Sequence, residues 1–179
     1  MNRDVWQDIP SGEEPPKKVD AVIEIPKGGR NKYEYDKRFG AYKLDRVLHS
    51  SVFYPGDYGL IPQTLFDDGD PLDILVLVDE PSFPGCIIPV RPIAKINMLD
   101  NGERDDKILA VPIDDPNMRE VRDKDDLAEH RLEEIEQFFR TYKLLEEDKK
   151  TDVLGWEGKE SAYNAIKKSM KSFSKEYKD

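Results

Sequence analysis

The chain has 179 residues, a length that suits a single domain with a hydrophobic core of its own. Its formal net charge of −10, from 28 basic and 38 acidic residues, argues against a protein that binds duplex nucleic acid or a membrane surface. The single cysteine, Cys86, excludes an intrachain disulfide and indicates a reducing, cytoplasmic compartment. Cys86 is expected to be a small buried residue. Residues 1–10 lack the apolar stretch of a signal peptide, and the apolar run Ile74–Val78 is far too short to span a bilayer.

Residues 1–18 are rich in Pro, Gly and charge and predict an irregular arm, with Trp6 as a packing anchor. After this arm, apolar and alternating segments predict short strands. Pro89 and Pro92 predict that the longest of these bends or lies at a sheet edge. Because Gly and Pro separate the segments and no helical pattern intervenes, we expect a closed or half-closed β-barrel. The predicted strands are 19–25, 32–36, 42–48, 72–78, 87–98 and 108–111.

The period becomes helical after residue 116. Apolar residues recur at steps of three and four between Leu127 and Leu145, which predicts an amphipathic helix that Asp123 or Asp125 could cap. Trp156 is expected to clamp a turn at Gly155. A second amphipathic helix is predicted from about Ser161. Its apolar face comprises Ala162, Ala165, Ile166, Ser169, Met170 and Phe173.

The most informative stretch is the acidic run from Asp67 to Asp73. Gly69 and Pro71 exclude a regular helix here, so a loop that enters a strand could direct Asp68, Asp70 and Asp73 into one cleft. Converging carboxylates repel one another by about 4 kcal/mol per pair at 4 Å, which cations would relieve. Oxygen ligands favour Mg²⁺ or Mn²⁺ over zinc. Taken alone, a solvated turn is an equally good interpretation.

Other polar groups are weaker candidates when each is considered alone. The simplest interpretation of the segment from Asp100 to Lys107 is a charged hairpin loop. The simplest interpretation of Glu24 is a solvent-facing residue of an apolar strand. Lysine and arginine on the predicted strands are most simply solvated, and the tyrosines are most simply half-buried. Anhydride chemistry would nevertheless need such donors for phosphoryl oxygens. The candidate donors are Lys32, Arg46, Tyr54, Tyr58, Tyr142 and Lys143.

Together these residues resemble the soluble inorganic pyrophosphatases of family I. The run Asp68-Gly69-Asp70-Pro71-Leu72-Asp73 resembles the signature of that family, Asp-x-Asp-Pro-hydrophobic-Asp. The other similar motifs occur in the family's order and span residues 24–143, about two-thirds of the chain. They are Ile23-Glu24-Ile25-Pro26, Lys32-Tyr33-Glu34, Asp45-Arg46, Phe53-Tyr54-Pro55, Tyr58-Gly59, Asp100 with Asp105 and Lys107, and Tyr142-Lys143.

The resemblance implies hydrolysis of inorganic pyrophosphate to two orthophosphates by a metal-activated water, with a role for each matched residue. Asp68, Asp73 and Asp105 would hold two metals, and Asp100 with Asp105 would hold a further one. Asp70 would accept the proton of the nucleophile. The implied cofactor is Mg²⁺, several ions per site, with Mn²⁺ or Co²⁺ as substitutes. Glu24 and Glu34 would line the cleft, and phosphoryl oxygens would bind Lys32, Arg46, Tyr58, Lys107, Tyr142 and Lys143, with Tyr54 nearby.

The resemblance also implies an α+β, mainly β fold: an OB-like five-stranded β-barrel with two packed C-terminal helices, in a single domain over residues 1–179. Short chains of the family resemble prokaryotic homohexamers. Two positions depart from the expected pattern, namely Asn101 after Asp100 and Asp57, where an Asn is expected. No nucleic-acid or membrane partner is implied.

Three alternatives remain at this point. An OB-like barrel could bind single-stranded nucleic acid, although such grooves are basic and this chain is acidic. A magnesium-dependent hydrolase could act on nucleotides or sugar phosphates, but the chain lacks a GxxxxGK[ST] loop. The chain could also be a structural subunit with incidental acidic loops, in which case it would bind no divalent ion tightly.

Overall fold

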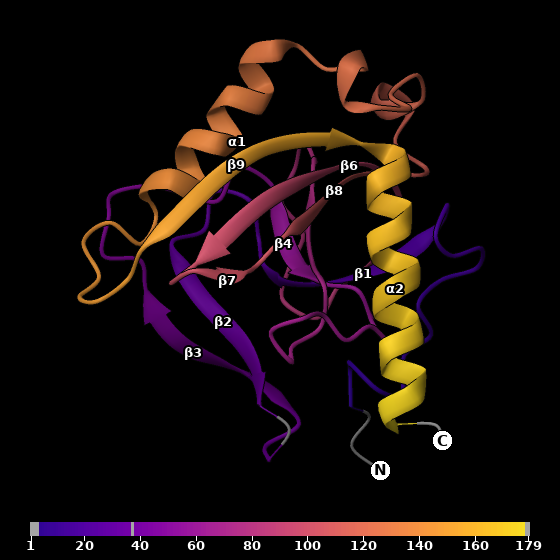
Figure 1. Ribbon diagram of the computed structural model, residues 1–179, viewed down its shortest axis with the longest axis horizontal. Coiled ribbons are helices and arrows are strands. Elements are labelled where there is room, and N and C mark those ends of the chain that lie inside the picture. Colours follow the sequence, from indigo (N-terminus) through magenta and orange to yellow (C-terminus); the bar gives the residue numbers. More distant parts are fainter. Residues whose placement is uncertain (1–3, 37, 178–179) are drawn as a thin grey trace.

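The structure is a computed structural model that describes residues 4–36 and 38–177. Strands dominate the described chain, and both α-helices belong to its last third (Figure 1). The strands are β1 (Val19–Ile25), β2 (Asn31–Asp36), β3 (Ala41–Val47), β4 (Asp57–Leu60), β5 (Asp73–Val76), β6 (Ile87–Asp100), β7 (Glu103–Arg104), β8 (Lys107–Pro112) and β9 (Thr151–Gly158). The helices are α1 (Glu129–Thr141) and α2 (Lys159–Tyr177), and two 3₁₀ segments cover Pro116–Met118 and Lys124–Asp126.

Five strands form the barrel. They pair in the order β1-β4-β5-β8-β6, and pairing of β6 with β1 closes the sheet on itself. Only the β5–β8 pair is parallel among these barrel pairings. Closure removes the exposed edges that an open sheet would present. The predicted five-stranded OB-like barrel with two helices is therefore confirmed.

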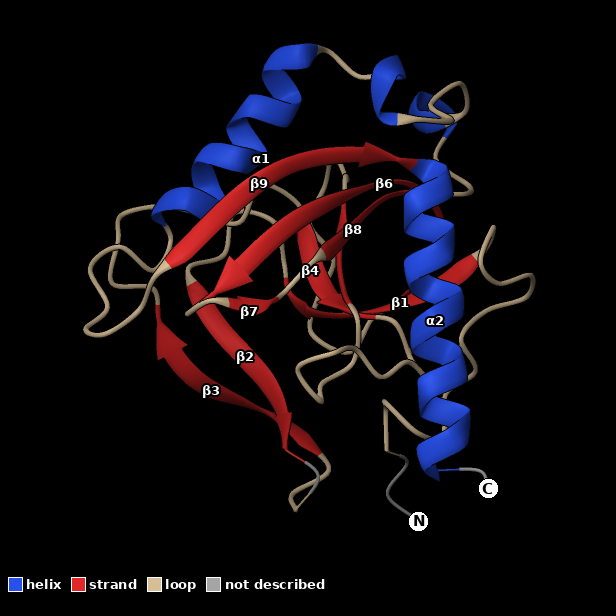
Figure 2. Ribbon diagram, viewed as in Figure 1, coloured by secondary structure: helices blue, strands red, loops and turns tan. Residues whose placement is uncertain are grey.

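The remaining strands lie outside the closed ring. β2 and β3 form a separate antiparallel hairpin, and β7 and β9 extend β6 (Figure 2). β9 carries α1 on one side, whereas α2 packs against β6. The β2–β3 hairpin, β7 and β9 are thus additions to the closed five-stranded barrel.

Two apolar clusters stabilise the two sides of the barrel. The first lies under α1 and β9 and contains Tyr54, Tyr58 and Phe139. The second lies under α2, where Ile166 belongs to the same cluster as Phe66 and Leu72. Because Phe66 and Leu72 flank the acidic loop, burial of their side chains fixes both ends of that loop.

β4 approaches β1 more closely than a side chain would allow. A Cβ atom on Gly59 would lie 1.9 Å from the carbonyl oxygen of Val22 on β1. Gly59 is therefore required by the packing of these two strands. Its neighbour Tyr58 is in register with Leu75 of β5, and the close packing of β4 on β1 fixes this position.

Several predicted segments differ from the structure. β4, β7 and β9 were not expected, and Trp156 lies in β9 rather than in a turn. The prolines of β6 cause a register shift against β8 between Pro92 and Ala94, while β6 stays internal to the sheet. Of the two alternatives predicted for this strand, the register shift agrees with a bend, and the internal position excludes an edge. Cys86 is only partly buried.

The cap predicted for the first helix is wrong. α1 begins after Ala128, which makes no side-chain cap, and Asp123 instead accepts a hydrogen bond from the backbone N–H of Lys159 at 3.1 Å, at the start of α2. The helix ends at Thr141, so Leu145 lies beyond it and is exposed. The buried face predicted for α2 is confirmed at Ala162, Ile166 and Phe173. Neither helix in the described residues has the length and apolar character needed to cross a bilayer.

Candidate active site

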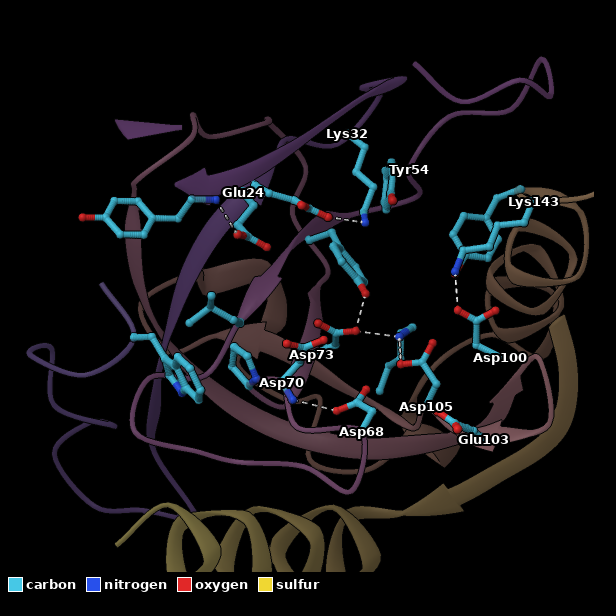
Figure 3. Close-up of a pocket in the computed structure, with 18 of the residues that line it drawn as sticks. Glu24, Lys32, Tyr54, Asp68, Asp70, Asp73, Asp100, Glu103, Asp105 and Lys143 are labelled. Carbon is cyan, nitrogen blue, oxygen red and sulfur yellow. Dashed lines mark hydrogen bonds and ion pairs between the residues drawn. The ribbon is translucent and has the colours of Figure 1, made fainter. Parts of the chain in front are cut away.

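One cavity of about 550 Å³ opens at the end of the barrel where β4, β5 and β8 meet the β2–β3 hairpin. Eight carboxyl and four basic side chains line it, a formal excess of four negative charges. Figure 3 shows the carboxylates of several strands and loops directed toward one another. The acidic residues are Glu24, Glu34, Asp68, Asp70, Asp73, Asp100, Glu103 and Asp105, and the basic residues are Lys32, Arg104, Lys107 and Lys143.

Asp73 lies at the centre of this cavity. The first residue of β5, it pairs in register with Lys107 of β8 and Leu60 of β4. One of its carboxylate oxygens accepts hydrogen bonds from the Tyr58 hydroxyl and from Lys107 Nζ, both at 2.6 Å. Lys107 Nζ also donates to Asp105 at 2.7 Å, so the ammonium group joins two carboxylates.

Lys107 is 1% exposed, and burial of a lone ammonium group would lower its pKa. Burial does oppose the charge, but the Asp73 and Asp105 carboxylates outweigh it and hold the pKa of Lys107 well above its ordinary value. The three groups therefore form a charged cluster inside the barrel. The neighbouring Asp106, also in the link between β7 and β8, instead accepts hydrogen bonds from Lys95 and Arg104 and does not line the cavity.

Asp68 and Asp70 lie on the loop between β4 and β5. The Asp68 carboxylate accepts the backbone N–H of Asp70 at 3.0 Å, and the Asp70 carbonyl accepts the N–H of Phe66 at 2.8 Å. These bonds fold the loop so that both side chains reach the cavity, while Asp67 faces α2 and pairs with Lys168. Among the described residues, the Asp70 carboxylate has no hydrogen-bond donor or ion-pair partner.

The remaining cations of the cavity are paired with acidic groups. Lys32 Nζ lies 2.6 Å from Glu34, and Lys143 Nζ lies 2.6 Å from Asp100. Tyr54 and Tyr142 are buried at the cavity wall. Lysine ammonium groups and phenol hydroxyls are the donors that phosphoryl oxygens need, so one cavity holds acceptors for cations and donors for anions.

Several of the carboxyl groups have raised pKa values. Burial, reinforced by the Asp73 charge, raises the pKa of Glu24 to about 8. Burial also raises the pKa of Asp68 to about 6, and raises the pKa values of Asp70 and Asp105. Burial is the largest cause of each of these shifts, and neighbouring carboxylates add to it. Clusters of this kind occur preferentially at functional sites.

The donor set fits a hard divalent cation, because it consists of carboxylate oxygens around a partly solvated cavity. Within the described residues, however, no three acidic, histidine or cysteine side chains converge closely enough to form a complete ligand cluster. The position between Asp73 and Asp105 is taken by Lys107 Nζ. The carboxylates therefore line one cavity, but within the described residues they are not close enough to one another to form a complete ligand set.

The structure brings all but one of the predicted site residues to this cavity. The exception is Arg46, whose side chain is held by Glu146 at 3.0 Å and Asp45 at 2.7 Å and is absent from the cavity lining. Its predicted contact with substrate stays a prediction. The cavity also has lining residues that we did not predict. These are Val5, Trp6, Tyr35, Leu60, Pro71, Asn101, Glu103 and Arg104.

Comparison with known proteins agrees with the residues of the site. The sequence profile of the family described as inorganic pyrophosphatase matches residues 21–174. An inorganic pyrophosphatase of Haloferax volcanii is 50% identical over 173 residues, 97% of this chain and 98% of that protein. One from Synechocystis sp. is 52% identical over 155 residues, 87% of this chain and 91% of that protein.

The crystal structure of the inorganic pyrophosphatase from Thermus thermophilus superposes with a TM-score of 0.90 at 42% identity, covering 93% of this chain and 97% of that one. The matches thus extend over the barrel, the acidic loop and both helices, and the family profile alone covers far more than half of the chain. The chain belongs to the inorganic pyrophosphatase family.

Proposed function

We propose that this chain hydrolyses inorganic pyrophosphate to two orthophosphates with the aid of Mg²⁺. The observation that carries this proposal is the composition of the cavity, where carboxylates suited to cations face lysine and tyrosine donors suited to phosphoryl oxygens. Pyrophosphate is a polyanion, and it would be repelled by a cavity whose described residues carry a formal excess of negative charge unless cations were bound as well. The family of the chain supports the same substrate and a divalent metal.

Asp68, Asp73 and Asp105 would hold two metal ions, and Asp100 with Asp105 would hold a further one. Bound Mg²⁺ would lower the pKa of a water and neutralise charge on the phosphoryl groups, with Mn²⁺ or Co²⁺ as substitutes. Asp73 lies within hydrogen-bond distance of both Tyr58 and Lys107, which orient its carboxylate. Asp105 is oriented in the same way by Lys107.

Asp70 would accept the proton of the attacking water. A general base must be ionised, near the reacting proton and free of other donors. The Asp70 carboxylate has no such donor within the part of the chain that is described, and the Asp73 charge together with burial raises its pKa. A raised pKa makes a carboxylate a stronger proton acceptor, provided that it stays ionised at working pH.

The basic and phenolic groups would bind the phosphoryl oxygens. Lys32 and Lys143 each form an ion pair with one carboxylate, Glu34 and Asp100 respectively. When substrate binds, a phosphoryl oxygen would replace that carboxylate, so each ammonium group would keep an anionic partner. Glu24 and Glu34 would act through water. The complete proposed set of anion-binding residues is Lys32, Arg46, Tyr54, Tyr58, Lys107, Tyr142 and Lys143.

Three broader proposals accompany this function. Residues 1–179 would form a single domain, in keeping with a profile match that spans most of the chain. The protein would act in the cytoplasm, as its single cysteine suggests. It would assemble as a homohexamer, which exposed apolar side chains such as Phe39, Phe53 and Leu144 support and light scattering would test. No nucleic-acid or membrane partner is proposed.

The test is orthophosphate release from pyrophosphate with Mg²⁺, with and without EDTA, beside ATP and a simple phosphomonoester. Rapid release from pyrophosphate, abolished by EDTA and much slower for the other substrates, is the expected result. No release with Mg²⁺, Mn²⁺ or Co²⁺ from folded protein would reject the proposal. Metal-independent gel-shift binding of single-stranded nucleic acid would then favour a binding barrel.

A further inference from the structure

The N-terminal segment 4–8 is outside every motif that suggested the function, yet two of its side chains, Val5 and Trp6, line the active-site cavity. The same cavity is lined by Asp70, Pro71 and Leu60. Most of this segment is only partly exposed. A terminal segment held in this way must be tied to the fold by specific contacts.

Those contacts go to the loop that carries Asp68 and Asp70. The Trp6 indole N–H donates to the carbonyl of Thr64 at 2.6 Å, and the Trp6 carbonyl accepts the N–H of Gln63 at 2.8 Å. The Gln63 side chain donates in turn to the Gln7 carbonyl at 3.0 Å. Gln63 has a φ of 52°, an uncommon backbone conformation for a non-glycine residue, and these bonds stabilise it.

Thr64 transmits this anchoring to the other end of the loop. It is fully buried, and its hydroxyl accepts the N–H of Leu72 at 2.9 Å while donating to the Ile61 carbonyl at 2.6 Å. Leu72 directly precedes Asp73. The bond from Trp6 therefore ends on a residue that fixes both the start and the end of loop 61–72.

Trp6 also joins the loop to the last turns of α2. Its ring lies 5.9 Å from that of Phe173 and 5.4 Å from that of Tyr177. The loop makes its own bonds to α2, from Leu65 N–H to the Ser169 carbonyl at 2.9 Å and from Asp67 to Lys168. The indole thus packs at the junction of the loop, the helix and the cavity.

We propose that Trp6 is a positioning residue that sets the places of Asp68 and Asp70 through the carbonyl of Thr64. The inference rests on the proposed function in that Asp68 is taken as a metal ligand. Loop 61–72 is held by the indole hydrogen bond on one side and by α2 on the other, so that a metal at Asp68 and the indole at Thr64 act on the same loop. Loss of the indole would release one side of the loop.

The first test measures Mg²⁺ binding by calorimetry without substrate. Because groups that orient metal ligands typically change affinity by about 10–100-fold, Trp6→Ala should raise the Mg²⁺ dissociation constant about tenfold. Trp6→Phe keeps the ring contacts but not the N–H donor, and it should give a smaller increase. The control Phe83→Ala removes an exposed aromatic side chain away from the cavity lining and should leave the constant unchanged.

The second test needs no activity and no change at Trp6. The chain has two tryptophans, so Trp156→Phe leaves Trp6 as the sole indole emitter. This substitution removes no hydrogen bond, because the buried indole nitrogen of Trp156 has no partner among the described residues. Trp6 emission should change saturably with Mg²⁺, and Asp68→Asn should weaken that response, since coupling between two sites is reciprocal.

The outcomes separate this inference from the proposed function. An unchanged Mg²⁺ constant in folded Trp6→Ala overturns the inference, as does Trp6 emission that is indifferent to Mg²⁺. If Trp6→Ala does not fold, the emission titration decides alone. If Mg²⁺ changes Trp6 emission but the protein does not hydrolyse pyrophosphate, the proposed function is rejected and the positioning role of Trp6 stands. If the protein hydrolyses pyrophosphate but Mg²⁺ does not change Trp6 emission, the positioning role is rejected and the proposed function stands.

Discussion

The ammonium group of Lys107 lies 2.6 Å from the carboxylate of Asp73, on neighbouring parallel strands that pair at these two residues. A second carboxylate, that of Asp105, lies 2.7 Å from the same nitrogen. A lysine side chain thus joins two carboxylates at the acidic centre of the barrel. Metal ions and Lys107 would therefore both compensate the same buried negative charge.

Replacement of Lys107 by Met should destabilise the metal-free protein by about 3 kcal/mol or more, because it leaves Asp73 and Asp105 uncompensated. Mg²⁺ should restore part of this loss, and should raise the melting temperature of Lys107→Met more than that of the wild type. Lys150→Met, which removes a highly exposed partner of Asp152, is the control and should change stability little. Equal effects of Mg²⁺ on all three proteins would contradict the prediction.

Asp70→Asn should separate binding from turnover. The substitution keeps the size of the side chain and removes only its charge, and no donor among the described residues has to be rearranged. General-base catalysis typically contributes about 10²–10⁴-fold, so kcat should fall by that order. Mg²⁺ and substrate affinities should stay near those of the wild type. Near-normal turnover by Asp70→Asn would remove this residue from the role of proton acceptor.

The stability of the metal-free protein should fall as pH rises from about 5 to 8. The folded pKa of Glu24 is about 8 against an ordinary value of 4.5, so in this window the folded protein retains a proton that the unfolded chain has lost. The stability contributed by that proton is complete at low pH and vanishes above pH 8. The change should be on the order of 2–3 kcal/mol.

Urea unfolding in EDTA at several pH values measures this slope. Glu24→Gln should show a flatter dependence than the wild type, since its amide does not titrate. Mg²⁺ should also flatten the wild-type curve, because a cation favours the ionised carboxylates. An identical pH slope in Glu24→Gln and the wild type would show that another group carries the effect.

The sequence predicted those parts of the fold that have a clear local signal. β1, β6 and α2 have long apolar or amphipathic patterns, and their residues lie where those patterns place them. β4 and β9 were missed because Gly59 and Gly155 read as turn residues. Only the close approach of β4 to Val22 shows why a glycine is needed within a strand.

Most residues of the candidate site could be located from the sequence because they are polar groups at family spacings, and all of them but Arg46 line one cavity. Trp6 was predicted only as a packing residue, because a single tryptophan within an irregular N-terminal arm belongs to no motif that indicates a functional role. Likewise, nothing local distinguishes Asp105 from Asp106. The family spacing favoured Asp105, and the structure gives the physical difference: Asp105 pairs with Lys107 at the cavity, whereas Asp106 pairs with Lys95.

Asp57 departs from the Asn expected at its position, and the structure gives a physical reason to retain it. The residue is fully buried, and its two carboxylate oxygens accept backbone N–H groups of Lys27 at 2.8 Å and Ser82 at 3.0 Å. An Asn side chain has one oxygen, so Asp57→Asn would point an amide N–H₂ group at one of these donors.

Asp57→Asn should therefore destabilise the protein by about 1–3 kcal/mol in urea unfolding. Asp152→Asn, at a partly exposed position where the ion-pair partner is the highly exposed Lys150, should cost less than about 1 kcal/mol and serves as the matched control. Because Asp57 does not line the cavity, kcat and the Mg²⁺ dissociation constant should be unchanged in folded Asp57→Asn. Equal stability of the two variants would mean that the loops at Lys27 and Ser82 rearrange to satisfy the amide.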